Sequence, residues 1–569
     1  MADTLVRSEQ DIDANLVTLS KFGRFWLLTV AAVDVLLVIA SMVALNAALP
    51  DIALETAATQ TQLTWVVDGY TLVLACLLLP AGALGDRYGR RGALLLGLAI
   101  FAVASLAPTI FDSPTQIIVA RAVAGVGAAF IMPATLSLLT SAFPKSERNK
   151  AVGIWAGVAS SGAVVGFMGT GLLLHFFPWQ SIFYGFAAAG VLMFACTLTI
   201  RSARDETATP VDWVGAVLSG AAVAVFVFGV LEAPPRGWTH PVVWGCMLAG
   251  VVLAGVFAAV ELRRPHPLLD VRLFAKPDFA TGSLGITFLF FANFGFFLVI
   301  MQYMQLVLGY SALTTGLALT PLAVPVMALG ATMHLYLPKI GLRVAVSSGL
   351  GFIAAGLYWM SFLEADTSYV TMVAPFLTIA VGIGLCVAPT TSAIMNAVPT
   401  EKQGVASAVN DTTREVGAAI GIAVAGSVLA AQYSSALSPG LVGLPEQVRG
   451  PALDSIANAL EVAEQMGPQG AELFRLAESA FLDAMELSVV VLAVVLAIAA
   501  VVVAFVAPGR DGTQPRVTRG VLSRFGKSGS PAASALGDDE VGGAVAEHDD
   551  GRVRAAAGDG GQDGSVDHP

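Results

Sequence analysis

The sequence predicts an all-α protein that crosses a lipid bilayer many times. Of its 569 residues, 56% are hydrophobic and only 12% are charged, a balance that water-soluble proteins of this length do not keep. The apolar residues gather in runs of about 20, which is the length that a helix needs to cross the hydrocarbon core. Inside lipid every backbone polar group must be hydrogen-bonded, so we expect each run to be a helix.

Fourteen apolar runs are long enough to be membrane spans. The segment before them, residues 1–24, is polar and has no cleavage pattern of a signal peptide, so we expect the first span to be retained. The predicted spans are roughly 25–48, 63–84, 93–110, 116–139, 151–173, 181–200, 213–232, 242–260, 279–301, 314–335, 346–363, 371–395, 405–430 and 486–507.

The loop charges predict the orientation of the spans. Short loops on one side of the predicted membrane contain fifteen Lys and Arg residues, and loops on the other side contain three. The fifteen are Arg87, Arg90, Arg91, Lys145, Arg148, Lys150, Arg201, Arg204, Arg263, Arg264, Arg272, Lys276, Lys339, Arg343 and Lys402, and the three are Arg236, Arg449 and Arg475. By the positive-inside rule the richer side is cytoplasmic, which places both termini in the cytoplasm and the protein in the cytoplasmic (inner) membrane.

A short charged hairpin joins the second and third spans. It reads Gly-Ala-Leu-Gly-Asp-Arg-Tyr-Gly-Arg-Arg over residues 82–91. Glycines there permit close backbone approach, and Asp86 stands where it could cap the helix that follows. The pattern resembles the signature loop of the major facilitator superfamily, which assigns a gating role to Gly82, Asp86, Arg87, Gly89, Arg90 and Arg91. The alternative is a generic basic hairpin.

A degenerate sequence repeat of this hairpin predicts the domain organisation. Residues 337–343 echo 84–91, with Pro338 where Asp86 stands. This implies a six-helix half at 25–200, an inserted pair of helices within 201–278, and a second six-helix half at 279–507. The layout of fourteen spans resembles the drug:proton antiporter branch of the superfamily. A long outside loop, 431–485, has amphipathic character, and the polar tail at 508–569 is expected to be disordered.

Charged residues inside spans are costly in lipid and mark candidate sites. Asp34 lies in span one, seven residues before Ser41, which occupies a position that is acidic in the antiporter branch. We expect Asp34 to replace that acid as a proton carrier; a carboxyl merely hydrogen-bonded to a neighbouring helix is the alternative. Asp68 in span two matches the branch pattern. Arg121 in span four resembles the family's second motif, so Arg121 with Asp34 or Asp68 is the predicted proton-coupling pair, or else a static ion pair.

Span five has an altered form of the family's antiporter motif. Its glycines keep the small-residue spacing, but the usual Gly-Pro step reads Gly166-Phe167. Since this motif marks exchange rather than uptake, the change leaves uncoupled or uptake transport open.

Further charged and aromatic residues complete the candidate sites. Asp411, Arg414 and Glu415 lie at i, i+3 and i+4 of span thirteen, where we favour a structural or inner-gate cluster over substrate binding. The predicted lining of an apolar substrate cavity is Trp65, Ser41, Asn46, Trp155, Phe294 and Glu232, where Glu232 could equally be a solvated acid.

These observations predict a proton-coupled, alternating-access exporter of lipophilic, cationic or zwitterionic compounds. The alternatives are export of an endogenous lipid, secondary metabolite or siderophore, and a non-transporting membrane receptor or assembly factor. Four cysteines, all within apolar runs, predict neither disulfides nor a metal site. We expect no enzymatic activity, no cofactor beyond the proton gradient, no nucleic-acid partner, and a monomer.

Overall fold

The computed structural model describes residues 20–56, 58–111, 113–200, 211–399, 402–442 and 444–509, all within one compact unit of the chain. The predicted polar N-terminal segment up to residue 19, the tail beyond residue 509, and Arg201 and Arg204 lie outside these residues.

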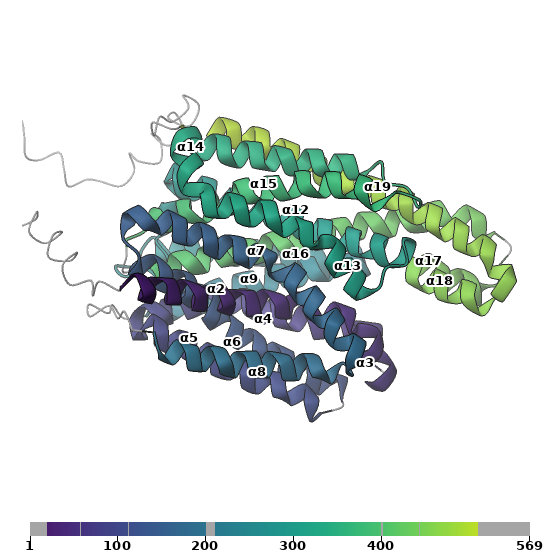
Figure 1. Cartoon of the computed structure of the whole chain (residues 1–569), viewed down its shortest axis with the longest axis horizontal. Helices are drawn as coiled ribbons and strands as arrows, with labels where there is room; N and C mark the ends of the chain where they lie inside the picture. Colours follow the sequence, from purple (N-terminus) through teal and green to yellow (C-terminus); the bar gives the residue numbers. More distant parts are fainter. Residues whose placement is uncertain are drawn as a thin grey trace, which may run out of the picture. The chain divides into compact units, whose positions relative to one another are not determined.

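Within the described residues the predicted all-α fold is confirmed, because long helices run side by side along one axis (Figure 1). The helices before residue 200 are α2 (Lys21–Ala44), α3 (Leu49–Thr56), α4 (Gln60–Tyr88), α5 (Arg90–Leu106), α6 (Pro114–Ala142), α7 (Lys145–Phe176) and α8 (Gln180–Leu198). Those after it are α9 (Trp213–Leu231), α10 (Ala233–Arg236), α11 (Pro241–Glu261), α12 (Pro277–Gln302), α13 (Ala312–Leu319), α14 (Ala323–Met360), α15 (Tyr369–Asn396), α16 (Gln403–Leu437), α17 (Glu446–Asp454), α18 (Ile456–Gln465) and α19 (Ala471–Val506).

Thirteen helical segments in the described residues are long and apolar enough to cross a membrane, and one of them contains two of the predicted spans. This segment, Leu313–Met360, bends at Gly341, whose φ of 77° is open to glycine but strained for other residues. Leu329 before the bend and Gly349 after it contact the same stretch of α15, near Gly384 and Cys386. The segment therefore folds back on itself, so the described residues contain fourteen candidate spans.

The hairpin at residues 84–91 and its predicted repeat at 337–343 share the same structural features. Gly89, between α4 and α5, has a φ of 108°, and Gly341 occupies the matching place in α14. Arg91 donates from Nη2 to the carbonyl of Leu198 at the end of α8 over 2.5 Å, and Arg343 donates from Nε to Ala507 at the end of α19 over 2.7 Å. Each arginine thus binds the carbonyl-rich end of a helix, where a cation is favoured.

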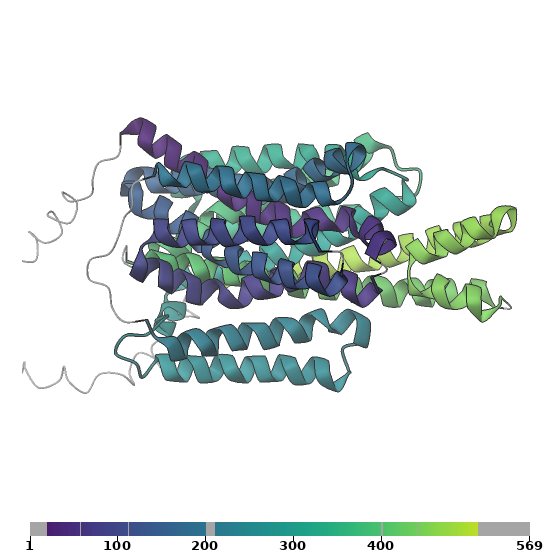
Figure 2. The same cartoon turned by 90° about the horizontal axis from the view of Figure 1, so that it is seen from below.

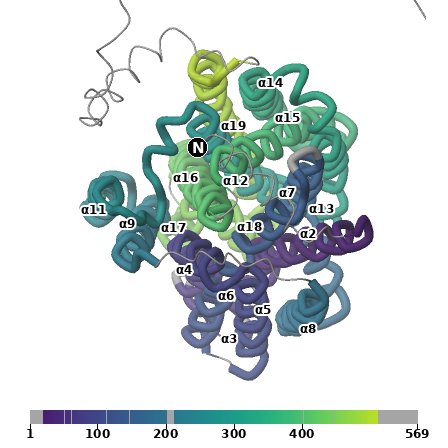
Figure 3. The backbone as a smooth tube through the Cα atoms, turned by 90° about the vertical axis from the view of Figure 1, so that its left-hand side faces the viewer, coloured from purple at the N-terminus to yellow at the C-terminus, as the bar shows by residue number. Residues whose placement is uncertain are grey.

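The inserted pair, α9 and α11, stands at one side of the bundle (Figure 2). Viewed along the helix axes, α9 lies between α11 and the pair α4 and α16, while α11 is outermost (Figure 3). The exposed side chains of α11 include Leu248, Val251 and Val252, as expected of a helix that faces lipid.

The segment predicted as a long outside loop of amphipathic character, 431–485, is a helical extension. Helices α16 and α19 continue beyond the other helices, and α17 and α18 connect them (Figures 1 and 2). Tyr433, Leu437 and Phe481 are buried in its small core, and the Tyr433 hydroxyl donates to the carbonyl of Ala452 over 3.1 Å. The amphipathic pattern seen in the sequence is the buried face of this extension.

Candidate functional site

A cavity of about 580 Å³ lies between helices that precede residue 200 and helices that follow it. Its walls come from α2, α4, α7, α9, α12 and α16. On α4 it extends from Thr64 to Ala75, and on α16 from Glu415 to Ile422. These are the stretches far from the 82–91 hairpin, so the cavity occupies the opposite half of the bundle. We call the end with the hairpin the hairpin end.

The cavity is apolar and aromatic, with two acidic side chains. Phe167, Phe294 and Phe297 line it together with methionines, and neutral amides add a few polar contacts. Asp68 from α4 and Glu415 from α16 are its acids, and no lysine or arginine is among its described lining residues. Because the described lining residues include no basic side chain, ionised carboxylates there give the cavity wall a negative potential.

The structure places two of the six predicted lining residues in this cavity. Asn46 and Phe294 line it. The other four do not, because each is engaged elsewhere. Ser41 is buried against Arg121, Trp65 packs its ring 6.0 Å from that of Phe228, Trp155 is fully buried with its ring 6.0 Å from the Arg414 guanidinium, and Glu232 forms an ion pair with Arg236.

Arg121 forms its described hydrogen bonds with neutral groups. Its Nη1 donates to Ser41 Oγ over 2.9 Å, its Nη2 to the Ser41 carbonyl over 3.0 Å, and its Nε to the Val66 carbonyl over 3.2 Å. The guanidinium also lies 4.2 Å from the centre of the Tyr70 ring, a cation–π contact. Among the described ion pairs none joins Arg121 to Asp34 or Asp68, so the predicted pair is not formed in this conformation.

Asp34 is completely buried on α2, and neither of its carboxylate oxygens has a hydrogen-bond partner in the described part of the chain. An ionised carboxyl without a partner is very costly in an apolar interior. Asp34 is therefore an unpaired buried carboxyl among the described residues.

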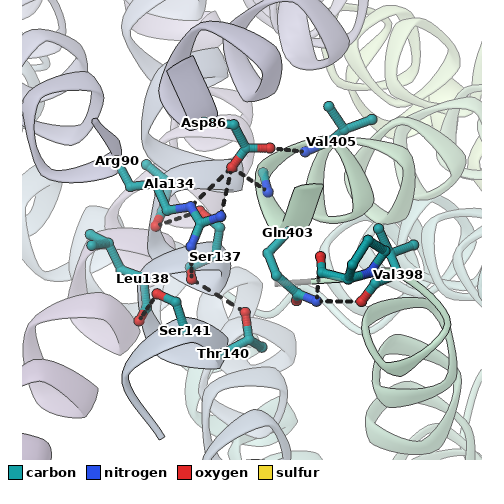
Figure 4. Close-up of polar contacts among 12 residues, drawn as sticks. Asp86, Arg90, Ala134, Ser137, Leu138, Thr140, Ser141, Val398, Gln403 and Val405 are labelled. Carbon is teal, nitrogen blue, oxygen red and sulfur yellow. Dashed lines mark hydrogen bonds and ion pairs between the residues drawn. The ribbon is translucent and has the colours of Figure 1, made fainter. Parts of the chain in front are cut away.

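Asp86 closes the hairpin end, though by a different contact from the predicted one. It lies in the last turn of α4, and its carboxylate caps the N-terminus of α16 instead of that of the helix that follows. Its Oδ1 accepts from Gly404 N over 2.9 Å and its Oδ2 from Val405 N over 3.1 Å (Figure 4). Arg90 also binds the carboxylate, over 2.9 Å. A charged cap at a helix N-terminus is favourable, so this contact ties the two halves together.

Close backbone packing supports this contact. A methyl group on Gly82 would lie 2.5 Å from the carbonyl oxygen of Gly404, so only glycine permits α4 and α16 to approach so closely. Gln403, next to the Asp86 contact, donates to the carbonyls of Met395 and Val398 at the end of α15, each over 2.9 Å (Figure 4). These contacts hold α4, α16 and the end of α15 together at the hairpin end.

A second, neutral contact joins the halves at the same end. Asn149 of α7 accepts from Ser392 Oγ over 2.7 Å and from Asn396 Nδ2 over 3.2 Å, both on α15. Nearby, a methyl group on Gly153 would lie 2.0 Å from the carbonyl oxygen of Gly330. The glycines of span five thus hold α7 against α14 in the other half.

The cluster on α16 divides between two environments. Arg414 Nη1 lies 3.4 Å from Asp411 Oδ1, and its guanidinium is 4.4 Å from the centre of the Phe290 ring. Asp411 is fully buried, whereas Glu415 lies one turn further along and reaches the cavity. The three residues were predicted to form one structural or inner-gate cluster, but Glu415 lines the cavity.

Sequence reasoning missed Val227 and Leu231 of α9, which also line the cavity. Hydropathy could only mark α9 as a span, because an apolar residue facing a cavity and one facing lipid look the same in a sequence. Phe167 was noted only as a departure from the antiporter motif, and the structure places its ring at the cavity wall.

The fold and the site define a polytopic membrane carrier, with a central cavity between two groups of helices and a closed contact at one end. The model of the Major Facilitator Superfamily matches residues 35–422. The chain belongs to this superfamily, and it is a multi-pass membrane transporter.

The chain is similar to proteins of multidrug resistance and multidrug efflux. The chain is 35% identical over 398 residues to the multidrug resistance protein Stp of Mycobacterium tuberculosis, covering 70% of this chain and 74% of Stp. It is also 35% identical over 486 residues to the multidrug efflux pump LfrA of Mycolicibacterium smegmatis, covering 84% of this chain and 96% of LfrA.

A solved structure supports the fold. The crystal structure of a bacterial homologue of the human lysosomal transporter Spinster, in an inward-facing and unoccupied conformation, superposes with a TM-score of 0.56 at 17% identity. The superposition covers 85% of this chain and 98% of that one.

Proposed function

We propose that this transporter exports lipophilic cations in exchange for protons. The observation that carries the proposal is the cavity, where Asp68 and Glu415 are the only ionisable residues among those that line it, surrounded by aromatic and aliphatic side chains. Such a cavity attracts a positive charge through its carboxylates and binds flat apolar groups through its aromatic rings. The names of the relatives Stp and LfrA, both multidrug proteins, support the same class of cargo.

The carboxyl groups also offer a mechanism of exchange. A carboxyl that holds a proton has no charge to attract a cation, so proton and cation compete for the same group. Protons entering from outside would displace the cation from Asp68 and Glu415, and release of those protons to the cytoplasm would restore the site. Asp34, buried without a partner, is a further proposed proton carrier.

The closed hairpin end gives the cycle its direction. The loop charges predict that this end faces the cytoplasm, so in this proposal the conformation described here is closed towards the cytoplasm. The Asp86 contact breaks when the halves rock, and the cavity then opens to the cytoplasm to load its cargo. In this proposal the protein acts as a monomer in the cytoplasmic membrane, with the proton gradient as its energy source.

The test uses inside-out membrane vesicles loaded with protons, so that export appears as uptake of ethidium. Wild type should accumulate ethidium only while the pH gradient lasts. Asp68→Asn and Glu415→Gln should each reduce this uptake strongly, while the exposed Asp278→Asn, at the hairpin end, should leave it unchanged. Uptake that persists without a pH gradient would exclude proton coupling.

The cargo class has its own test. Neutral and anionic analogues of similar size should compete poorly with ethidium, because the carboxylates give them no attraction. Equal competition by an anionic siderophore or an endogenous lipid would favour the alternative export functions.

A further inference from the structure

We propose that α9, from the inserted helix pair, is a wall of the substrate cavity, and that Leu231 and Val227 determine which substrates fit. The inference rests on the proposed export of lipophilic cations. It gives the inserted pair a direct part in recognition, in place of a role as a peripheral attachment.

The first support is position. Val227 and Leu231 lie one helical turn apart on α9 and both line the cavity that contains Asp68 and Glu415. Leu231 is half-buried, which leaves part of its side chain open to the cavity. By contrast, Val217 on the same helix is 68% exposed on the outside of the bundle.

The second support is the attachment of α9 to the first half. Near one end of α9 the Phe228 ring packs 6.0 Å from that of Trp65 on α4. Further along, a methyl group on Gly220 would lie 2.9 Å from the carbonyl oxygen of Cys76, so the two backbones touch there. Contacts at two levels hold α9 along α4.

The third support is its contact with the second half. Val227 and Val230 form an apolar cluster with Ala419 and Ala423 of α16. Helix α9 therefore covers the gap between α4 and α16, which belong to different halves (Figure 3). Without it, this side of the cavity would open towards lipid, so the side chains of α9 set the width of the cavity there.

A first experiment tests position without relying on transport. In a background with Cys76, Cys196, Cys246 and Cys386 replaced, Leu231→Cys should react with a permanently charged methanethiosulfonate reagent added outside, and tetraphenylphosphonium should slow the reaction. The matched control Leu248→Cys, on α11, is 55% exposed at the surface that faces lipid. It should react at least about tenfold more slowly, because a charged reagent is excluded from hydrocarbon. Equal rates at the two positions would overturn the proposal.

A second experiment tests specificity. Leu231→Phe and Val227→Phe narrow the cavity, and they should lower export of bulky tetraphenylphosphonium about tenfold or more relative to small methyl viologen. Leu231→Ala should shift the ratio the opposite way. The controls Leu248→Phe and Val217→Phe should keep the wild-type ratio.

The outcomes separate this inference from the proposed function. If wild type exports no cation, the proposed function fails, while the labelling result still reports where Leu231 lies. If wild type exports both cations and the α9 variants keep its ratio, the role of α9 in specificity is disproved. A variant absent from the membrane is replaced by Leu231→Ala, which removes volume and introduces no clash.

Discussion

Asp86 joins two helices of different halves through one carboxylate. It accepts from two backbone N–H groups of α16 and pairs with Arg90 of α5. Bonds to a charged group contribute about 1.5–3 kcal/mol each, so this one side chain strongly favours the closed hairpin end.

Replacing Asp86 by Asn removes the charge while keeping the shape. We expect Asp86→Asn to insert normally but to lose transport, because the closed state loses roughly 2 kcal/mol relative to the open one. Vesicle uptake of ethidium measures the loss, and Asp278→Asn is the control. Normal transport by Asp86→Asn would remove the gate from the mechanism.

Moving the acidic residue from position 34 to position 41 tests whether a carboxyl in span one couples transport to protons. Arg121 already binds Ser41, so an acid at position 41 would meet the guanidinium directly. We expect Asp34→Asn to abolish uptake driven by the pH gradient, and the double variant with Ser41→Asp to restore part of it. Asp34→Asn with Ser41→Asn should stay inactive. If Asp34→Asn alone transports like wild type, Asp34 has no part in coupling.

At the residue scale, the sequence selected candidate residues but did not predict the partners that they contact. Motif resemblance selected Asp86 and Arg121, because their residue types and spacing stand out. Their contacts lie far along the chain: Asp86 binds residues 318 and 319 positions away, and Arg121 binds one 80 positions away. Spacing along one helix carries no information on such tertiary contacts.

Among the elements, α7 is placed to couple the two halves. Gly153 and Gly157 pack against α14, while Gly162 and Gly166 pack against α2. A single helix therefore has one contact face for each half, and small residues keep both interfaces close. The altered antiporter motif retains this arrangement even without its proline.

Gly153→Ala should weaken closure of the hairpin end. The added methyl group would lie 2.0 Å from the Gly330 carbonyl oxygen, so the backbones must separate, at a cost of about 1–3 kcal/mol. Spin labels across the hairpin end should report a larger open population. Gly169→Ala on the same helix is the control, since nothing lies within 4 Å of its added methyl group.

The predicted helix bounds were accurate where hydropathy alone determines them. They were inaccurate where packing extends a helix beyond its apolar run. The inserted helix predicted at 213–232 is Trp213–Leu231 in the structure. Helix α19, predicted at 486–507, begins fifteen residues earlier, at Ala471. Its added turns include charged residues such as Glu472 and Arg475, and they are stabilised by packing within the extension. Hydropathy cannot detect that packing.

At the scale of the whole molecule, the loop charges predict that the hairpin end faces the cytoplasm. In the background lacking native cysteines, Val442→Cys should react with an impermeant reagent in intact cells, and Tyr88→Cys only after permeabilisation. Both side chains are well exposed, at 83% and 61%, and they lie at opposite ends of the bundle. The reverse pattern would mean that the hairpin end faces outside.

The helical extension has a practical consequence for imaging. A transporter of 58.6 kDa is mostly hidden within detergent or lipid, which leaves few landmarks for aligning single particles by electron microscopy. Here α16 and α19 project as continuous rods, capped by α17 and α18 and joined through a packed interior. An antibody fragment raised against the helical extension would keep a fixed angle to the core helices. It would therefore report the tilt of these helices in each state of the transport cycle.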